Sequence, residues 1–288
     1  MITVKLVDSK GLTLEANYDH DEVSFEEALL TNLVGWTSGN DVRMDLAERM
    51  GDGDYFTPST RSGRTLTWSL NYELLSRREL WDLDRRISGL FRDGGLGTLS
   101  VDHDGEVLHA EVSLDGPPKT ELNVDAGYLI AEIPLFAPEA FIYGDEVKVS
   151  LLPAGTGIGL EYPLHGPVVN PQGEPVLSYG EDRTTNDPVT NTGNADAAPI
   201  YTVVGDYPTG FKLQVRDRVI NWPIPTSPQA PVVINMEGYI TVGGYDQTEM
   251  ATVREWSVIE PGETVFPLFS PHQSGVGYCE VSLRPTYL

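Results

Sequence analysis

Apolar and polar residues alternate in short runs along most of the chain, and turn-forming residues separate the runs. Residues 2–7 and 12–16 alternate on either side of a polar turn that begins at Asp8, so they predict a β-hairpin. The apolar run at residues 29–36 is compatible with a strand, or with a short helix that starts at Ser24. Further strands of the first half are predicted at residues 65–72, 97–101, 107–112 and 128–135.

One segment has a helical pattern and predicts an α-helix over residues 76–93. Ser76 is the expected N-cap, and Glu79 three residues later completes a capping box. Asp93 and the two glycines after it end the helix. Apolar residues recur at intervals of three and four and form a stripe that we interpret as core packing: Leu80, Leu83, Ile87, Leu90 and Phe91. The polar side is expected to carry a solvated row of ion pairs: Arg78, Asp82 and Arg86.

The second half contains no segment with a convincing helical pattern. Strands are predicted at residues 147–152, 200–204, 210–215, 219–222, 232–235, 239–242, 253–256, 264–268 and 277–284. Short strands at this spacing are typical of a sandwich or barrel. A break near Tyr143, Gly144 and Asp145 predicts two domains, residues 1–144 and 145–288. The predicted fold class is therefore mainly β, with one packed helix in the N-terminal β domain and a C-terminal β-sandwich.

Residues 39–63 form the most irregular stretch of the first half, rich in glycine and interrupted by Pro58. A long loop of this kind in a compact domain is usually functional or disordered. Two adjacent aromatic residues within it argue for burial, either against another subunit or as a plug on the domain's own core. We expect residues 39–64 to contribute intersubunit contacts through Tyr55, Phe56, Arg61 and Arg64.

The charge of the chain limits what it binds. Its 288 residues carry a net charge of −24, and both halves are acidic. A phosphate-binding face needs clustered Lys and Arg, so the balance argues against stable DNA binding. The acidity serves either solubility alone or the wall of a channel past which DNA slides. Cys279 is the only cysteine, which excludes an internal disulfide, and neither a signal peptide nor a membrane anchor is expected.

The sequence offers no convincing catalytic, metal or cofactor site. Asp102 and the residues after it resemble the start of a calcium loop, but the twelfth position is Ser113 instead of the required Glu. Asp52 and Asp54 are close in sequence, yet a spacing of two residues defines no catalytic geometry. No metal-binding spacing links the five histidines: His20, His103, His109, His165 and His272. We expect a protein that is not an enzyme and carries no cofactor and no metal.

Several segments, in order, resemble distal tail proteins of siphophages, especially the tail proteins of phages that infect actinobacteria. Residues 31–38 are similar to the family's early Gly-Trp segment. Residues 51–56 and 62–68 resemble its glycine turn and the following Gly-Arg-Thr strand. Residues 130–144 resemble the strand and Ala-Pro-Asp-Pro element that closes its first domain, although Pro-Glu-Ala replaces the commoner Asp-Pro.

The second half continues the resemblance. Residues 190–200 are close to the family's Asn-x-Gly entry to the C-terminal domain, and residues 256–264 resemble its Trp-x-x-Leu-x-Pro-Gly turn. Ile259 and Thr264 stand where Leu and Asn are usual. Residues 280–285 look like its closing strand. The order and spacing of these segments across nearly the whole chain carry the resemblance, since each segment alone is weak.

The resemblance implies a structural virion protein at the distal end of a phage tail, made in the host cytoplasm. The N-terminal domain is expected to form a hexameric ring, with a galectin-like C-terminal sandwich on the outside. Such a ring docks the tail tube protein on one face and the tail-tip hub protein on the other, and leaves a channel through which DNA passes without stable binding.

Two alternatives remain open from the residues. The first is a carbohydrate-binding tail adhesin, in which Trp222, Tyr239, Tyr245 and Trp256 stack on sugars instead of filling the core of the sandwich. Fold class alone does not decide between this adhesin and a purely structural tail protein. The second is a cell-wall hydrolase, for which no catalytic acid is identified.

Overall fold

The structure is a computed structural model that describes residues 2–17, 27–37, 42–44, 47–49, 52, 54–55, 58–73, 75–153 and 187–288. Strands dominate it, and these residues contain one α-helix and one short 3-10 helix. The expected fold class, mainly β with one helix in the first half, is confirmed. Within the described ranges, no helix has the length and apolar content that a membrane crossing requires. The chain divides into two compact units: Met1–Asp145 with Thr286–Leu288, and Glu146–Pro285.

The first unit is built on a sheet that closes on itself. Its elements are β1 (Ile2–Val7), β2 (Thr13–Asn17), β3 (Glu27–Val34), β4 (Val42–Arg43), β5 (Ala47–Glu48), β6 (Asp54–Tyr55), β7 (Thr60–Arg61), β8 (Arg64–Tyr72), α1 (Arg77–Ser88), β9 (Gly97–His103), β10 (Glu106–Leu114), β11 (Lys119–Asn123), β12 (Tyr128–Ala137), β13 (Ile142–Gly144) and β26 (Thr286–Tyr287). The strand order is β11-β12-β8-β3-β2-β1-β9-β10-β13-β26, and β10 also pairs with β12. The strands from β12 round to β10 therefore form a closed barrel, whose inward side chains make one apolar core.

The register explains why alternating residues predicted these strands. In β8 every second residue is buried, from Arg64 to Tyr72, and its partner β12 shows the same alternation. The pairing of β1 with β2 confirms the predicted hairpin, with Leu6 opposite Leu14. The run at residues 29–36 forms most of a strand, so the alternative of a short helix from Ser24 does not hold for residues 27–34. Ser24 itself lies outside the described residues.

Helix α1 begins as the sequence predicts and ends earlier. Ser76 is the N-cap: its hydroxyl accepts from the backbone N–H of Glu79, whose carboxylate accepts from the N–H of Ser76 at 2.7 Å. The helix stops at Ser88 instead of residue 93, because Phe91 takes a left-handed conformation with φ of 49° and Gly89 caps the last turn. The predicted apolar stripe is buried throughout.

The polar side of α1 differs from the expected row of ion pairs. Arg78 and Asp82 lie 3.9 Å apart, at the edge of ion-pair distance. The guanidinium of Arg86 instead donates a hydrogen bond to the backbone carbonyl of Thr13 in β2. Arg86 therefore ties the helix to the first residue of β2 instead of joining the row of ion pairs.

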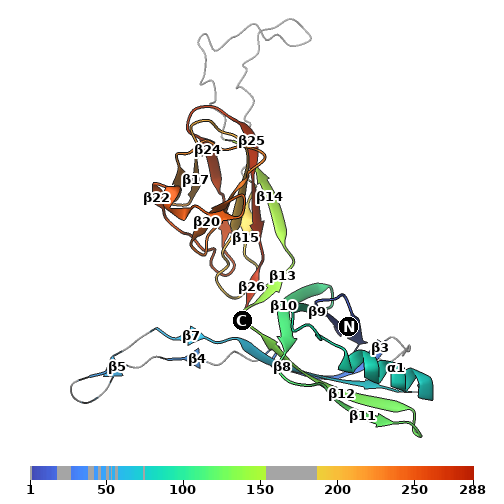
Figure 1. The fold of residues 1–288 in the computed structure, drawn as a ribbon. Helices are drawn as coiled ribbons and strands as arrows, with labels where there is room; N and C mark the ends of the chain where they lie inside the picture. Colours follow the sequence, from blue (N-terminus) through green and yellow to red (C-terminus); the bar gives the residue numbers. More distant parts are fainter. Residues whose placement is uncertain are drawn as a thin grey trace, which may run out of the picture. The chain divides into compact units, whose positions relative to one another are not determined.

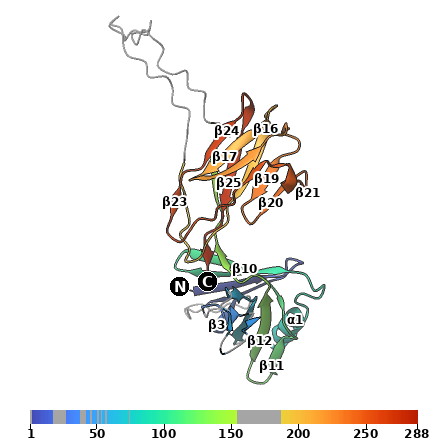
Figure 2. The same ribbon diagram turned by 90° about the vertical axis from the view of Figure 1, so that its left-hand side faces the viewer.

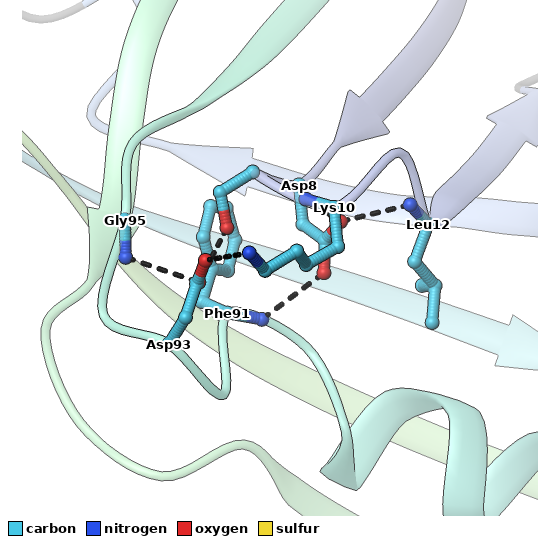
Figure 3. A network of polar contacts seen from close by, with 7 residues as sticks. Asp8, Lys10, Leu12, Phe91, Asp93 and Gly95 are labelled. Carbon is cyan, nitrogen blue, oxygen red and sulfur yellow. Dashed lines mark hydrogen bonds and ion pairs between the residues drawn. The ribbon is translucent and has the colours of Figure 1, made fainter.

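A buried carboxylate orders the turn between β1 and β2 (Figure 3). The side chain of Asp8 accepts from the backbone N–H groups of Lys10 and Leu12, both at 2.8 Å, and from that of Phe91 at 3.3 Å. Asp8 is 6% exposed, so these bonds replace its lost hydration. The turn and the segment after α1 are thereby held to each other.

Asp93 forms a second link between the same two segments (Figure 3). Its carboxylate accepts from the Ser9 hydroxyl at 2.5 Å and from the Gly95 N–H at 3.2 Å, and it lies 3.2 Å from the Lys10 ammonium. Hydrogen bonds from Ser9, Gly95 and Lys10, in that order, lower the pKa of Asp93 to about 2. They favour its ionised form over that of an unfolded chain, where an aspartate titrates near pH ~4.

This difference predicts a pH-dependent contribution to stability. The contribution of Asp93 is complete above pH ~4 and disappears as the pH falls through the folded value of about 2. We expect Asp93→Asn to lower the melting temperature at pH 6, and the gap to the natural chain to narrow steadily below pH ~4. Circular dichroism melts from pH 6 to 2 measure it, with Asp125→Asn at an exposed turn as the control. A gap that stays constant to pH 2 would contradict the assigned role.

The second unit is a β-sandwich (Figure 2). Its elements are β14 (Val147–Leu151), β15 (Val189–Thr190), β16 (Ile200–Asp206), β17 (Phe211–Val215), β18 (Arg218–Trp222), β19 (Val232–Asn235), β20 (Tyr239–Val242), β21 (Tyr245–Asp246), η1 (Thr248–Met250), β22 (Val253–Arg254), β23 (Thr264–Val265), β24 (Leu268–Pro271) and β25 (Val276–Leu283). One sheet has the order β14-β25-β16-β19-β20-β21 and the other β22-β18-β17-β24. Buried side chains from both sheets form a single core, where the rings of Tyr207, Phe211 and Phe269 meet edge to face or tilted.

The last residues of the chain belong to the first unit. Strand β26 pairs with β13, with Tyr287 opposite Ile142, and the Tyr287 hydroxyl donates to Glu106 at 3.0 Å. The second unit is therefore an insertion between β13 and β26. This differs from the expected domain of residues 145–288, because a two-residue strand at a terminus leaves no periodic signal in the sequence.

Candidate assembly site at the base of a β-arm

The stretch expected to be irregular, residues 39–63, contains a two-stranded arm in its described parts. Strands β3 and β8 are antiparallel neighbours, and the pairs β4–β7 and β5–β6 continue the same hairpin outward. Figure 1 shows β4, β5 and β7 beyond β8, outside the closed barrel. The expectation of a loop is corrected: strand pairing holds this segment even though its residues do not alternate.

The arm exposes apolar side chains that its own unit does not cover. Val42, Met44 and Tyr55 are each more than half exposed. A two-stranded hairpin has no interior in which to bury them, and such a hairpin alone is marginally stable in water. Uncovered apolar side chains on one projecting segment make it a candidate surface for protein interaction.

The four expected intersubunit residues have different environments. Tyr55 and Arg61 are exposed on the arm, and the guanidinium carbon of Arg49 lies 4.9 Å from the centre of the Tyr55 ring. Phe56 lies outside the described residues. Arg64 is only 3% exposed, so the expectation that its side chain contacts another subunit is wrong.

Arg64 instead closes the base of the arm from inside. Its Nη1 donates to the backbone carbonyls of Gly35, at 3.0 Å, and Trp36, and its Nη2 donates to the carbonyl of Ala140 at 3.4 Å. Burial lowers the pKa of Arg64, and the positive charge of Arg61 lowers it further. Three backbone carbonyls compensate for the lost hydration of the guanidinium, so the side chain joins segments that are distant in sequence.

Two glycines permit this close packing. Gly35 has a φ of +89°, and a Cβ there would lie 2.3 Å from the carbonyl oxygen of Thr65. A Cβ at Gly63 would lie 2.6 Å from the Phe136 ring and 2.7 Å from the carbonyl of Ala137. The Gly-Trp, Gly-Arg-Thr and Ala-Pro segments, which the sequence shows as three separate motifs, therefore meet around Arg64.

The second unit has an equivalent polar centre at Asn191, which is fully buried. Its Nδ2 donates to the carbonyls of Ala195 at 2.7 Å and Ile259 at 2.9 Å, and its Oδ1 accepts from the N–H of Gly193 at 3.0 Å. Its backbone also exchanges hydrogen bonds with the turn at residues 262–263. Asn191 thus joins the Asn-x-Gly segment to the Trp-x-x-Leu-x-Pro-Gly-like turn.

The four residues considered for sugar stacking do not form one platform. Trp222 is 1% exposed and presents no free ring face, and Trp256 is partly buried against the same core. Tyr239 and Tyr245 are exposed, but Tyr245 is opposite Val242, whose side chain projects from the other face of β20 than that of Tyr239. The assignment of Trp222 to a sugar site is therefore corrected: it fills the core.

A row of three polar residues that the sequence did not reveal crosses β9 and β10. The Ser100 hydroxyl lies 2.9 Å from Nδ1 of His109, and Nε2 of His109 lies 2.9 Å from Asp145. These residue types are those of a catalytic triad. The aspartate of such a triad is buried, however, whereas the side chain of Asp145 is 77% exposed. We interpret the row as a cross-strand ladder. Strand register sets it, because His109 is opposite Ser100 and not near His103.

The described residues hold no cluster of three or more His, Cys, Asp or Glu side chains that is arranged to bind a metal ion. Cys279 is fully buried in β25, and burial raises the pKa of its thiol well above the ordinary range. A thiol that stays protonated and covered is a packing group and not a nucleophile.

Comparison with known proteins places this architecture. No protein-family model matches the chain, and no curated protein matches it. Among solved structures, the chain is similar to the crystal structure of the SPP1 Dit (gp 19.1) protein, described as a paradigm of the hub adsorption apparatus in phages that infect Gram-positive bacteria. The TM-score is 0.61 at 13% identity, over 100% of both chains.

Two structures of the phage P2 baseplate in its activated conformation also match. The form with Ca has a TM-score of 0.46 at 13% identity, over 99% of this chain and 98% of that chain, and the form with Sr has 0.46 at 12% over the same shares. The TM-score of 0.61 shows that the chain has the fold of the SPP1 Dit protein. The resemblance to distal tail proteins that the motifs carry is confirmed at the level of the fold.

Proposed function

We propose that this chain is a structural protein of a phage tail, a distal tail protein that assembles as a hexameric ring between the tail tube and the tail-tip hub. The observation that carries the proposal is the arm. It is a projecting hairpin with three exposed apolar side chains among its described residues, and a buried arginine fixes it to the barrel. Similarity of fold to a tail hub protein over the full chain supports the same assignment.

Ring formation explains why the arm exists. A closed ring uses head-to-tail contacts, in which one patch of each copy meets a different patch of the next copy. The arm provides the first patch, because its apolar residues lie outside the barrel and lack cover within the unit. Tyr55 and Arg61 lie on it and are its expected contacts, as aromatic and arginine side chains are enriched where interfaces gain most of their free energy.

The charge of the chain fits a channel that DNA traverses. With a net charge of −24 per copy, a ring repels the phosphate backbone and does not hold it. In this account the ring docks the tail tube protein on one face and the tail-tip hub on the other, at the distal end of the virion tail. The protein then acts by assembly, without an enzymatic step and without a cofactor.

Removal of the arm tests the proposal. We expect deletion of residues 42–61, bridged by a short Gly-Ser linker, to abolish the oligomer while the melting temperature changes by only a few degrees, since the core of the barrel lies elsewhere. Light scattering coupled to size-exclusion chromatography measures the mass of both chains.

A matched pair of point variants refines this experiment. Tyr55→Ala on the arm should weaken assembly, whereas Tyr245→Ala, an exposed tyrosine of the second unit, should leave the mass unchanged. If the chain without residues 42–61 still assembled fully, the arm would not be the contact that forms the oligomer. A natural chain that remains a monomer at every concentration, both alone and mixed with tail tube protein, would contradict the ring itself.

A further inference from the structure

The outward face of α1 combines an exposed tryptophan with exposed arginines. The helix lies on the outside of the barrel beside β11 and β12 (Figure 1). Trp81 is 44% exposed, and the side chains of Arg78 and Arg85 are 93% and 77% exposed. Arg77 and Arg85 are four residues from Trp81 in either direction, so all three share one face. A tryptophan in this position is unusual, because the residue is highly buried on average.

This face is basic in an otherwise acidic unit. Residues 1–145 contain twelve basic and twenty-seven acidic side chains, and five of the twelve lie within residues 77–92. The same sixteen positions contain only three acids. The positive charge of the unit is therefore concentrated on the helix and the turn after it.

The acids of the helix are already engaged. Glu79 completes the capping box, and Asp84 accepts a hydrogen bond from the Thr120 hydroxyl at 2.7 Å. Asp82 is shared between Arg78 at 3.9 Å and Arg85 at 3.8 Å, both at the limit of an ion pair. One carboxylate thus faces two guanidinium groups, and each guanidinium keeps most of its donors directed to solvent.

We propose that the outward face of α1, centred on Trp81 with Arg77, Arg78 and Arg85, is a docking surface for exposed carboxylates of a second copy of this chain. This inference rests on the ring proposed above and adds to it a second contact between copies, separate from that of the arm. Copies that each carry a charge of −24 repel one another, so a stable contact has to pair opposite charges locally. The α1 face is where the described surface of the unit concentrates the positive charge needed.

Charge reversal on this face tests the inference. We expect Arg78→Glu/Arg85→Glu to raise the concentration for half-assembly of the full chain by about tenfold or more, and 0.5 M NaCl to have a similar effect on the natural chain. Trp81→Ala should weaken assembly without a change in net charge. Mass photometry across a dilution series measures each. The matched control is Arg218→Glu/Arg254→Glu, the same change at exposed positions of the second unit.

The outcomes separate this inference from the ring proposal. Natural chain and α1 variants that assemble equally overturn the α1 interface and leave the ring intact. A natural chain that never assembles overturns both. An α1 variant and a control that weaken equally also overturn the inference, because the effect is then one of total charge. Because all the altered side chains are exposed, we expect the variants to melt at nearly the same temperature as the natural chain, and melting curves check that each variant is folded.

Discussion

Replacement of Arg64 by alanine is expected to lower the free energy of unfolding of the first unit by about 3 to 5 kcal/mol. The guanidinium is 3% exposed and donates to three backbone carbonyls, of Gly35, Trp36 and Ala140. Its removal leaves those carbonyls buried with fewer partners and opens a cavity at the base of the arm. Chemical denaturation followed by circular dichroism measures the loss.

The neighbouring Arg61 supplies the control for this variant. Arg61 is exposed on β7, so Arg61→Ala should change stability by no more than about 0.5 kcal/mol. Arg64→Lys should recover little, because one ammonium group does not reproduce the planar fork that reaches three carbonyls. Equal stability of the two alanine variants would show that Arg64 does not hold the arm.

Replacement of Asn191 by alanine is expected to destabilise the second unit by about 2 to 4 kcal/mol. The side chain is fully buried and makes three hydrogen bonds, to Ala195, Ile259 and Gly193. Alanine removes all three and leaves two buried carbonyls and one N–H short of a partner. Differential scanning calorimetry of the full chain resolves the effect on the unit to which Asn191 belongs.

Asn221 offers a matched control for this experiment. Its side chain makes a hydrogen bond to the Thr252 hydroxyl at 2.6 Å in an exposed position. We expect Asn221→Ala to cost about 1 kcal/mol or less, because water replaces the lost bond. A cost for Asn191→Ala as small as that for Asn221→Ala would contradict the role of Asn191 as the link between the two segments.

Local patterns in the sequence were sufficient for the elements whose partners are close in the chain. The hairpin around Asp8 and the capping box at Ser76 depend on residues two to four positions apart, and both are present. The alternation of β8 and β12 also appears directly in the sequence, because burial on one face of a sheet has a period of two.

The remaining features depend on contacts between distant residues. Arg64 donates to the carbonyls of Gly35 and Ala140, which are 29 and 76 positions away in the sequence. Its charge alone predicted an exposed side chain, but these distant partners bury it. The only sign of this contact in the sequence was the resemblance to distal tail proteins, which included the Gly-Trp, Gly-Arg-Thr and Ala-Pro segments that meet around Arg64. The ladder of Ser100, His109 and Asp145 depends on strand register, which no local pattern specifies.

The arm was missed for a related reason. Residues 39–63 lack alternation, because neither face of a projecting two-stranded hairpin is buried in its own unit. The predicted helix extended past Ser88 for the opposite reason: Leu90 and Phe91 keep the apolar spacing of the helix and are buried, although both lie beyond its last residue and Phe91 is left-handed.

Negative-stain electron microscopy of the purified full chain, alone and mixed with tail tube protein, tests the central claim most directly. The account predicts six-fold rings with a central hole, formed by the natural chain and lost when residues 42–61 are removed. Compact single particles without rotational symmetry under both conditions would contradict a ring-forming tail hub.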